Sequence, residues 1–398
     1  MKKEATLSNK QLINMLTEFL RKNILLSDNQ GIDHTLVICL FALTAIGFIM
    51  ITSATLDHAY QTRGNSFYFI IKHSIYLIMG ITLSFIISRI KLSFYNDYSK
   101  IFLLLSLIVS LIIFIPGLGK EVNGARRWLD LGFMTVQVSE VSRLFIMLWV
   151  CSFISRSDVN KVFNKCLFMI IILSIIILLQ KDFGSTVLLV STFFSLMLIS
   201  GLDLKKLLSY FFLILVAAVP LILYQPYRLR RVLSFFNPWD DPSGSGYQLI
   251  ASLLAFGKGG IFGLGLGSSV QKLNYLPESY NDFIFALIAE ELGLIFSLII
   301  ILLFVIIFFR IIRLAITSSK NNLKFASYLS YTIGFFVTFQ ALIHILVNIG
   351  LAPTKGMGLP FISYGGTNLL IMFIFFGLLI RIQIENRQKI SQAVLREY

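Results

Sequence analysis

Long apolar runs alternate with short polar segments along most of the chain. A bilayer core about 30 Å thick needs roughly 20 apolar residues per helix. Ten runs meet or approach this length, so the pattern predicts about ten transmembrane helices. The predicted runs are 34–55, 67–88, 101–116, 138–155, 164–180, 184–201, 206–224, 283–309, 326–349 and 367–384. The predicted fold class is an all-α integral membrane protein, with residues 34–384 forming a single polytopic domain.

The composition favours the same class. Of the 398 residues, 57% are hydrophobic and 14% are charged, whereas soluble domains have about 25% charged residues. Such a chain cannot hide its apolar surface inside one water-soluble globule. The net charge of +14 points to membrane topology and lipid headgroups rather than to nucleic acid. The three cysteines lie in or beside apolar runs, which is typical of small core residues rather than a disulfide framework.

Lysine and arginine predict the orientation. An even number of spans puts both termini on one side, and that side carries about 21 basic residues against about 11 on the other. Basic loops face the cytoplasm, so both termini are predicted to be cytoplasmic. The outer side nevertheless contains two basic clusters: Arg126 and Arg127, and then Arg228, Arg230 and Arg231. They predict an anionic ligand there, and contact with lipid phosphates is the alternative.

The segment 225–282, between the seventh and eighth predicted spans, departs from a simple bundle. It begins with clusters of Pro, Gly, Asp and Asn that mark turns, and it continues as a half-apolar, glycine-rich stretch. Irregular backbone at membrane depth is tolerated where it is buried in protein or lines a wet cavity. We therefore predict a long extracytoplasmic loop with a re-entrant segment.

The polar ends of the chain, residues 1–33 and 385–398, are predicted to be cytoplasmic tails. The first lacks an apolar core followed by a small-residue cleavage site, so no removable signal peptide is expected. One helical face in this tail is apolar, with Leu12, Leu16, Phe19 and Leu20. This face fits an interfacial helix lying on the membrane, and a solvated tail fits equally well.

A carboxylate, Asp282, lies at the N-terminal end of the eighth predicted span. Asp282 precedes the first apolar turn, where free amide groups and the positive end of the helix dipole favour the charged form. The basic, turn-rich segment before it could hold a phosphorylated substrate. An ionised aspartate beside such a substrate suits a general base that removes a proton from an incoming hydroxyl. An ordinary helix cap is the alternative explanation.

Four further charges lie deeper in the predicted spans. Glu290 and Glu291 are about 12 Å beyond Asp282 at 1.5 Å per residue, too far to share one small reacting centre with it. Glu140 and Arg143 lie on one face of the fourth span. Charges at such depth usually pair inside the bundle. We expect structural or gating ion pairs, with Arg143 as a candidate partner of Glu290 or Glu291 and a local Glu140–Arg143 pair as the alternative.

Lys355 lies in the turn-rich run APTKGMGLPFISYGGTN on the predicted outer side. As a point charge it could meet a substrate phosphate, or it could extend to the membrane interface. The four histidines lack the paired spacing of a metal site, and no nucleophile elbow of the acyl-transfer kind is present. The sequence requires no cofactor, although a divalent cation, Mg²⁺ or Mn²⁺, held by Asp282 and a pyrophosphate stays open.

Five stretches together resemble the SEDS family of bacterial cell-wall proteins, named for shape, elongation, division and sporulation. They are NGARRWLDLGFMTVQVSEVSR (123–143), QKDFGST (180–186), RLRRVLSFFNPWDDPSGSGYQLIASLLAFGKGGIFGLGLGSSVQKLNYLPES (228–279), NDFIFALIAEELG (281–293) and PTKGMGLPFISYGG (353–366). The resemblance covers residues from about 34 to 385. The sequences SVQKLNYLPES and PTKG are more similar to the division branch of the family than to the elongation branch.

The resemblance implies a ten-helix glycosyltransferase that polymerises lipid II, the lipid-linked disaccharide peptide, into septal glycan strands. The implied partners are a class B penicillin-binding protein, which cross-links the strands, and other division proteins. In such a protein Asp282 is the essential carboxylate, and Arg127, Arg143 and Lys355 act in activity or substrate handling.

The chain departs from the family pattern at four places, and each keeps the flanking charged or glycine residue. Tyr280-Asn281 stands for His-Thr, Val138 and Lys181 each stand for a proline, and Thr367-Asn368 stands for Ser-Ser.

The predicted mechanism is a single displacement. Asp282 takes the proton of the acceptor sugar's 4-hydroxyl while that oxygen attacks the anomeric carbon of the lipid-linked donor, and undecaprenyl pyrophosphate leaves with inversion. The candidates for binding the substrate and the leaving charge are Arg126, Arg127, Arg228, Arg230, Arg231 and Lys355. A lipid II flippase or other transporter is the alternative, and for it the deeper charges would decide. A scaffold without chemistry would leave both sets replaceable.

Overall fold

The computed structural model describes residues 32–122, 124–132 and 134–397, which form a helical bundle with one small sheet. The helices are α2 (His34–Arg63), α3 (Tyr68–Arg89), α4 (Leu92–Asp97), α5 (Ser99–Ile112), α6 (Val138–Ser155), α7 (Val159–Leu179), α8 (Phe183–Ile199), α9 (Leu204–Leu223), α10 (Pro226–Phe236), α11 (Tyr247–Gly259), α12 (Ile284–Lys320), α13 (Lys324–Asn348) and α14 (Gly366–Glu397). The strands are β1 (Gly119–Val122), β2 (Ala125–Asp130) and β3 (Thr135–Gln137), and the short helical turns are η2 (Pro238–Asp240) and η3 (Gln271–Tyr275).

The predicted all-α membrane class is confirmed. Within the described residues, eight helices are long and apolar enough to cross a membrane: α2, α3, α6, α7, α9, α12, α13 and α14. Two shorter apolar helices, α5 and α8, fall at the remaining predicted runs. The exact number that crosses a bilayer stays a prediction.

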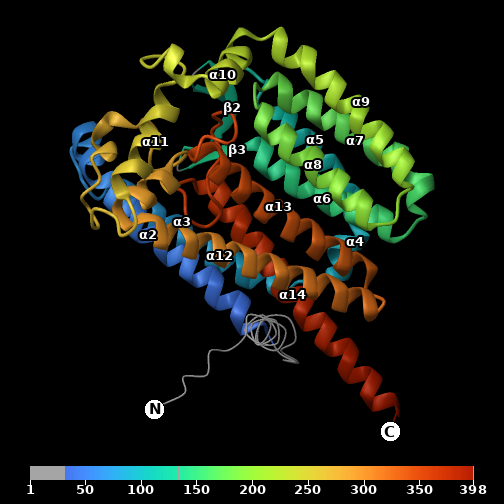
Figure 1. The fold of residues 1–398 in the computed structure, drawn as a ribbon. Coiled ribbons are helices and arrows are strands. Elements are labelled where there is room, and N and C mark those ends of the chain that lie inside the picture. The colour runs from blue at the N-terminus through green and yellow to red at the C-terminus, as the bar shows by residue number, and fades with distance from the viewer. Residues whose placement is uncertain (1–31, 123, 133, 398) are drawn as a thin grey trace, which may run out of the picture.

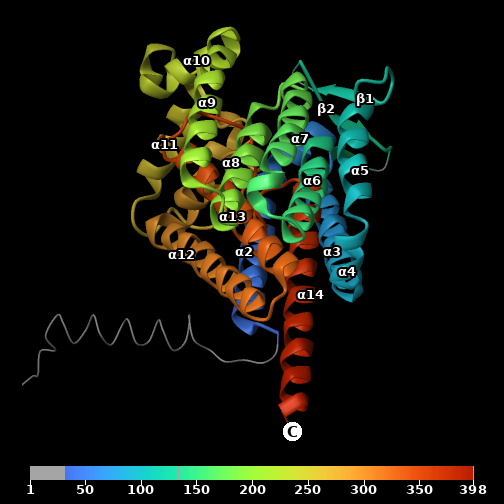
Figure 2. The same ribbon diagram turned by 90° about the vertical axis from the view of Figure 1, so that its right-hand side faces the viewer.

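The bundle has two distinct ends. Figures 1 and 2 show the sheet and α10 at one end, here called the loop end, and the C-terminal part of α14 at the other, here called the terminal end. The start of α2 lies at the terminal end, because the Asp33 amide donates to Gln383 of α14 at 2.7 Å. The Asp33 carboxylate also pairs with Arg310 at 2.6 Å. The first described residues and the C-terminal part of α14 therefore lie at the same end of the bundle.

Close packing of the helices depends on small residues at their crossings. A Cβ at Gly80 of α3 would meet the ring of Phe373 in α14, and a Cβ at Gly377 would meet the backbone of Ser84. Helices in membranes pack through such small residues, because lipid removes most of the hydrophobic force between them. α3 and α14 can therefore lie against each other along their length.

The three-stranded sheet was not predicted. Strands β1, β2 and β3 are antiparallel neighbours in that order, with Trp128 opposite Gln137 and Asp130 opposite Thr135. The chain turns at Gly124 and Gly132, where φ is 69° and 81°, values that glycine adopts without a steric penalty. Two of the basic residues predicted to bind substrate, Arg126 and Arg127, lie on β2.

Two helices extend beyond the predicted apolar runs. α14 continues through residues 385–397 of the predicted tail, and α12 continues to Lys320, past the end of the predicted run at residue 309. That span is also interrupted at Gly293. The long segment before it does contain a helix, α11, whose buried face packs against α12; its position relative to a bilayer stays a prediction. The interfacial helix expected in residues 1–33 falls almost wholly outside the described residues.

Candidate functional site

Asp282 lies in a tight turn before α12. Its amide and that of Asn281 both donate to the carbonyl of Glu278, at 2.9 and 3.1 Å, and Glu278 has φ of 54°. The Asp282 carbonyl accepts a hydrogen bond from the Asn348 side chain at 3.1 Å. The turn thus fixes the backbone and leaves the carboxylate outside the helix.

The interpretation of Asp282 as a helix cap is wrong. The residue that caps α12 is Phe283, and no side-chain hydrogen bond is made there. No group among the described residues donates a hydrogen bond to the Asp282 carboxylate. Burial and the nearby charge of Glu278 raise the pKa of Asp282 to about 7, against the opposing effect of Arg231 and Arg127. The expectation that helix amides hold this group ionised is therefore also wrong.

The loop after α13 covers the carboxylate. A Cβ at Gly356 would lie 2.8 Å from Oδ2 of Asp282, so only a glycine lets the loop come this close without displacing the carboxylate. The neighbouring Thr354 carbonyl accepts a hydrogen bond from Arg231 of α10 at 2.9 Å. Three segments distant in sequence thereby meet at Asp282.

Lys355 extends from this loop toward the start of α8. Its side chain lies against Gly184, where a Cβ would overlap the lysine methylene groups, and its ammonium donates to the Met357 sulfur at 3.0 Å. Burial lowers the pKa of Lys355 to about 7, although Asp182 opposes this shift. Lys355 and Asp282 therefore both have pKa values near 7.

Asp182 is the second carboxylate of the site. It is buried and accepts hydrogen bonds from Gln137 (3.1 Å), Ser139 (2.9 Å) and Ser185 (2.7 Å). Burial raises its pKa, but the charge of Arg127 and the Ser185 hydrogen bond lower it more, so the pKa lies below its ordinary value. Asp182 is therefore a fixed negative charge rather than a proton acceptor.

The predicted basic residues separate into a central and a peripheral group. Arg127 donates to the carbonyls of Gln180 (3.3 Å) and Lys181, and Arg231 reaches the loop above Asp282. Arg228 donates to the carbonyl of Leu221 at 2.8 Å and stacks on Phe183. Arg126 is exposed and pairs with Glu121 at 3.3 Å, and Arg230 is exposed on α10. The structure brings Arg127, Arg231, Lys355 and Asp282 together and leaves Arg126 and Arg230 outside.

The Glu140–Arg143 pair lies inside the bundle on α6. The two side chains are buried and 3.9 Å apart, and Asn368 donates to Glu140 at 2.9 Å. Arg143 donates to the Ser139 carbonyl at 3.1 Å and covers the ring of Phe336. Glu140 Oε2 and Arg143 Nη1 are buried without a hydrogen-bond partner. This polar pair continues inward from the Asp182 network.

Arg143 is not the partner of Glu290 or Glu291, so that expectation is wrong. Glu291 pairs with Lys272 at 3.1 Å, and Glu290 accepts from the backbone amides of Val270 and Gln271 at the start of η3. Lys272 was missed because it lies in a stretch that reads as a loop. Gly356 and Asn348 were missed because their role depends on contacts between distant segments.

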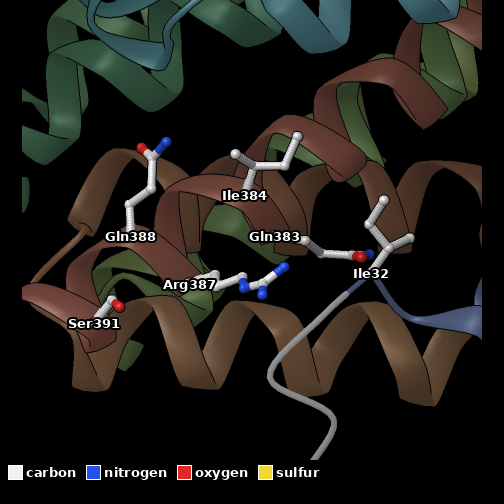
Figure 3. Close-up of a pocket in the computed structure, with 6 residues that line it drawn as sticks. All are labelled: Ile32, Gln383, Ile384, Arg387, Gln388 and Ser391. Carbon is white, nitrogen blue, oxygen red and sulfur yellow. The ribbon is translucent and has the colours of Figure 1, made fainter.

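A cavity of about 340 Å³ lies away from these groups. Figure 3 shows its lining at the terminal end: Ile32, Gln383, Ile384, Arg387, Gln388 and Ser391. A large pocket is the usual first candidate for a site. This cavity is lined by a single ionisable residue, Arg387, and it lies at the opposite end of the bundle from Asp282. It is therefore not a candidate for the catalytic site. Across residues 32–122, 124–132 and 134–397, no group of three or more His, Cys, Asp or Glu side chains is arranged to hold a metal ion.

Comparison with known proteins identifies the family. The sequence model of the cell cycle protein family FtsW/RodA/SpoVE matches residues 33–388. The chain belongs to this family. The SEDS resemblance predicted from five stretches is thereby confirmed.

Relatives of the FtsW/RodA/SpoVE chain extend over nearly its whole length. A Coxiella burnetii protein named probable peptidoglycan glycosyltransferase FtsW is 41% identical over 358 residues, 89% of this chain and 96% of its own. An Escherichia coli protein of the same name is 39% identical over 369 residues, 92% of this chain and 89% of its own.

Solved structures share the fold. A chain of the structure described as "Structural coordination of polymerization and crosslinking by a peptidoglycan synthase complex" superimposes with a TM-score of 0.72 at 23% identity, covering 89% of this chain and 98% of its own. The rod shape determining protein RodA of Thermus thermophilus gives a TM-score of 0.66 at 21% identity, covering 89% and 97%. At these identities the likeness shows the fold alone.

One departure from the family pattern has a structural consequence. Lys181, which stands where a proline was expected, has φ of 62°, a value that the proline ring forbids. Its ammonium donates to the carbonyl of Gly124, and its own carbonyl accepts from Arg127. In this FtsW/RodA/SpoVE chain the turn before Asp182 is therefore tied to the sheet by a lysine.

Proposed function

We propose that the chain is a peptidoglycan glycosyltransferase that polymerises lipid II into glycan strands for the division septum. The relatives named FtsW, 39–41% identical over about nine tenths of the chain, support this assignment over a lipid II flippase. The deeper charges that transport would use pair with fixed groups of the protein.

The observation that carries the mechanism is the state of Asp282. Its carboxylate has a pKa of about 7, it accepts no hydrogen bond from the described residues, and it lies beside a cationic loop. A general base works best when its pKa lies near the operating pH. Asp282 thus takes the proton of the acceptor's 4-hydroxyl as that oxygen bonds to the anomeric carbon of the donor. The bond from that carbon to the pyrophosphate oxygen breaks, and the configuration inverts.

The central cations hold the leaving pyrophosphate. Arg127, Arg231 and Lys355 converge on Asp282 from three segments, and fixed positive groups stabilise negative charge that develops in the transition state. An anion beside Lys355 favours its protonated form. Binding of the pyrophosphate therefore raises the pKa of Lys355, which burial alone lowers. Arg228 is expected to contact the lipid phosphates at the rim, with Arg126 and Arg230 contributing long-range attraction. No step requires a second carboxylic acid, because pyrophosphate leaves without protonation.

The proposed setting follows the same relatives. The chain is a multi-pass membrane protein, and we place it in the inner membrane with both termini cytoplasmic and the loop end outside. The similarity to a chain of a peptidoglycan synthase complex supports a class B penicillin-binding protein as partner, together with other division proteins.

The test uses the purified chain with its partner in liposomes containing labelled lipid II. Asp282→Asn is expected to reduce strand synthesis by about 10²- to 10⁴-fold, the usual contribution of a general base, with lipid II transport across the bilayer unchanged. Strands made at the normal rate by this variant would refute the assignment of the base. Transport lost together with synthesis would favour the flippase.

A further inference from the structure

The interruption of α12 joins it to a distant segment. Gly293 has φ of 79° and ψ of −175°, which no helix contains. In a continuous helix the amides of Leu294 and Ile295 would donate to the carbonyls four residues earlier. They donate instead to Gly260 and Ile261, at 3.0 and 3.3 Å.

The carbonyls left over at this break are used as well. Those of Glu290 and Glu291 accept the amides of Leu264 and Gly265, both at 2.9 Å. Segment 260–265 therefore inserts into the broken turn and replaces both helical hydrogen bonds. Broken helices at membrane depth require this satisfaction, because an unpaired backbone group in a bilayer costs several kcal/mol.

The side chains at the break hold the next part of the same segment. Both glutamates are almost fully buried, at 0% and 1% exposure. The Glu290 carboxylate accepts the hydroxyl of Ser269 and the amides of Val270 (3.2 Å) and Gln271 (3.3 Å). Glu291 accepts the Ser269 amide at 3.4 Å. Two carboxylates thus fix the start of η3.

A lysine supplies the positive charge of this cluster. The Lys272 ammonium, in a residue 8% exposed, donates to Gly267 at 2.7 Å, to Glu291 at 3.1 Å and to Ser53 of α2 at 3.2 Å. The Ser53 hydroxyl also donates to Glu291 at 2.8 Å. The ammonium therefore uses all three of its protons inside a cage of oxygen atoms.

We propose that Lys272 is a positioning residue for Asp282, acting through a latch made of Ser269, Lys272, Glu290 and Glu291. The latch holds both ends of the chain segment 273–289, which contains the Asp282 turn. Ser269 and Lys272 lie just before this segment, and Glu290 and Glu291 follow it directly. This inference rests on the proposed function and assigns it a residue that does not touch the substrate. Glu290 and Glu291 are then neither ligands nor gates but the fixed end of the catalytic turn.

Opening the latch has a predictable effect on the base. Burial is the main cause of the raised pKa of Asp282, so a loosened turn that admits water lowers that pKa toward its ordinary value. A weaker base removes the proton more slowly, but it remains ionised at lower pH. The maximal rate falls, and the acid side of the pH–rate profile moves to lower pH.

The experiment compares Lys272→Met with Lys258→Met, which removes an exposed lysine from α11. Full-length chain with its partner in liposomes is assayed for strand synthesis across pH, and amide hydrogen exchange is followed by mass spectrometry. In Lys272→Met, exchange in 273–282 is expected to accelerate at least tenfold with α13 unchanged, kcat to fall about tenfold, and the acid limb to move down by about one pH unit. Lys258→Met should match the wild type in all three.

A second variant covers the case in which an unpaired Glu291 prevents folding. Lys272→Met/Glu291→Gln removes both partners of the ion pair together and leaves Glu290 with the hydroxyl and amide donors it has in the wild type, and it should reproduce the faster exchange and the shifted limb. Unchanged exchange and an unmoved limb in either variant would overturn the latch. Asp282→Asn separates this failure from failure of the proposed function, because it should reduce synthesis by about 10²- to 10⁴-fold at every pH while leaving exchange in 273–282 slow.

Discussion

Asp282 and Lys355 are side chains of opposite charge at the loop end, and their pKa values lie in the same range. Burial raises the pKa of Asp282 to about 7 and lowers that of Lys355 to about 7. Each group is therefore poised to change its charge near neutral pH. The site needs the first deprotonated, to accept the acceptor's proton, and the second protonated, to bind the leaving pyrophosphate.

The free enzyme should consequently show a narrow bell-shaped profile of kcat/KM centred near neutral pH. Below about pH 7 Asp282 becomes protonated and the rate falls as the pH falls; above about pH 7 Lys355 loses its proton and the rate falls as the pH rises. Lys355→Arg should remove the alkaline limb, because a guanidinium stays protonated. Initial rates measured across about pH 5 to 9 check this expectation, and an alkaline limb that persists in the variant would assign it to another group.

A single methyl group at Gly356 should disturb the base without disturbing the fold. The Cβ in Gly356→Ala would lie 2.8 Å from Oδ2 of Asp282, whereas in Gly365→Ala the nearest atom, of Asn368, is at 3.6 Å, an ordinary contact. Neither glycine has a positive φ. We expect Gly356→Ala to lower kcat about 10- to 100-fold, a displacement effect of the size seen for misplaced groups, with thermal stability unchanged. Gly365→Ala should keep both, and equal kcat values in the two variants would contradict the contact.

At the scale of elements, hydropathy predicts where helices run. It does not predict where a helix is interrupted and a distant segment supplies the missing hydrogen bonds. The run 283–309 reads as continuous because Gly293 is neutral in hydropathy, and its break is supported by residues 260–265, which lie some thirty positions earlier. The sheet was missed because its strands are three to six residues long and mostly polar. For the site, Asp282, Arg127 and Lys355 could be predicted from charge in unexpected places and from the family resemblance. Gly356 and Lys272 could not, since only their tertiary contacts give them a role.

The break in α12 predicts a specific loss of stability on substitution of Gly293. Gly293→Ala meets two penalties: a left-handed φ of 79° and a Cβ that overlaps the backbone of segment 260–265. Gly201→Ala meets only the first, because φ is 86° and the space around it is open. A positive φ costs an alanine about 1–2 kcal/mol, and at Gly293 the ψ of −175° adds to this cost because that combination is essentially restricted to glycine, so Gly293→Ala should lose clearly more.

Thermal unfolding of both variants in the same detergent measures this difference. Equal shifts of the midpoint would mean that segment 260–265 is not wedged into the break. A larger shift for Gly293→Ala, with faster amide exchange in 260–265, is the expected outcome.

On the scale of the whole molecule, polar groups extend inward from the loop end into the bundle. The side chains of Gln340 and His344, on α13, form hydrogen bonds with the carbonyls of Gly358 and Met357 in the loop after α13 that covers Asp282. Their remaining polar atoms, Gln340 Oε1 and His344 Nε2, are buried without a partner in the described structure, as are Glu140 Oε2 and Arg143 Nη1. The terminal end contains paired charges instead, such as Asp33 with Arg310. The interior at the loop end thus holds buried polar atoms that are available for further partners, which suits chemistry on a headgroup presented at that side.

These orphan atoms predict bound water inside the bundle. A buried polar atom without a partner costs about 1–3 kcal/mol, and Arg143 Nη2 and Glu140 Oε1 are 3.9 Å apart, a separation at which a water can lie between polar groups. Hydroxyl-radical footprinting in nanodiscs should therefore label Phe336, which lies under Arg143, despite its 2% exposure. Met372, with 0% exposure in the apolar core, is the dry control. Labelling of both at the same low rate would show that the polar core is dry. Labelling of Phe336 alone, lost in Arg143→Met/Glu140→Gln, would show that this pair holds the water.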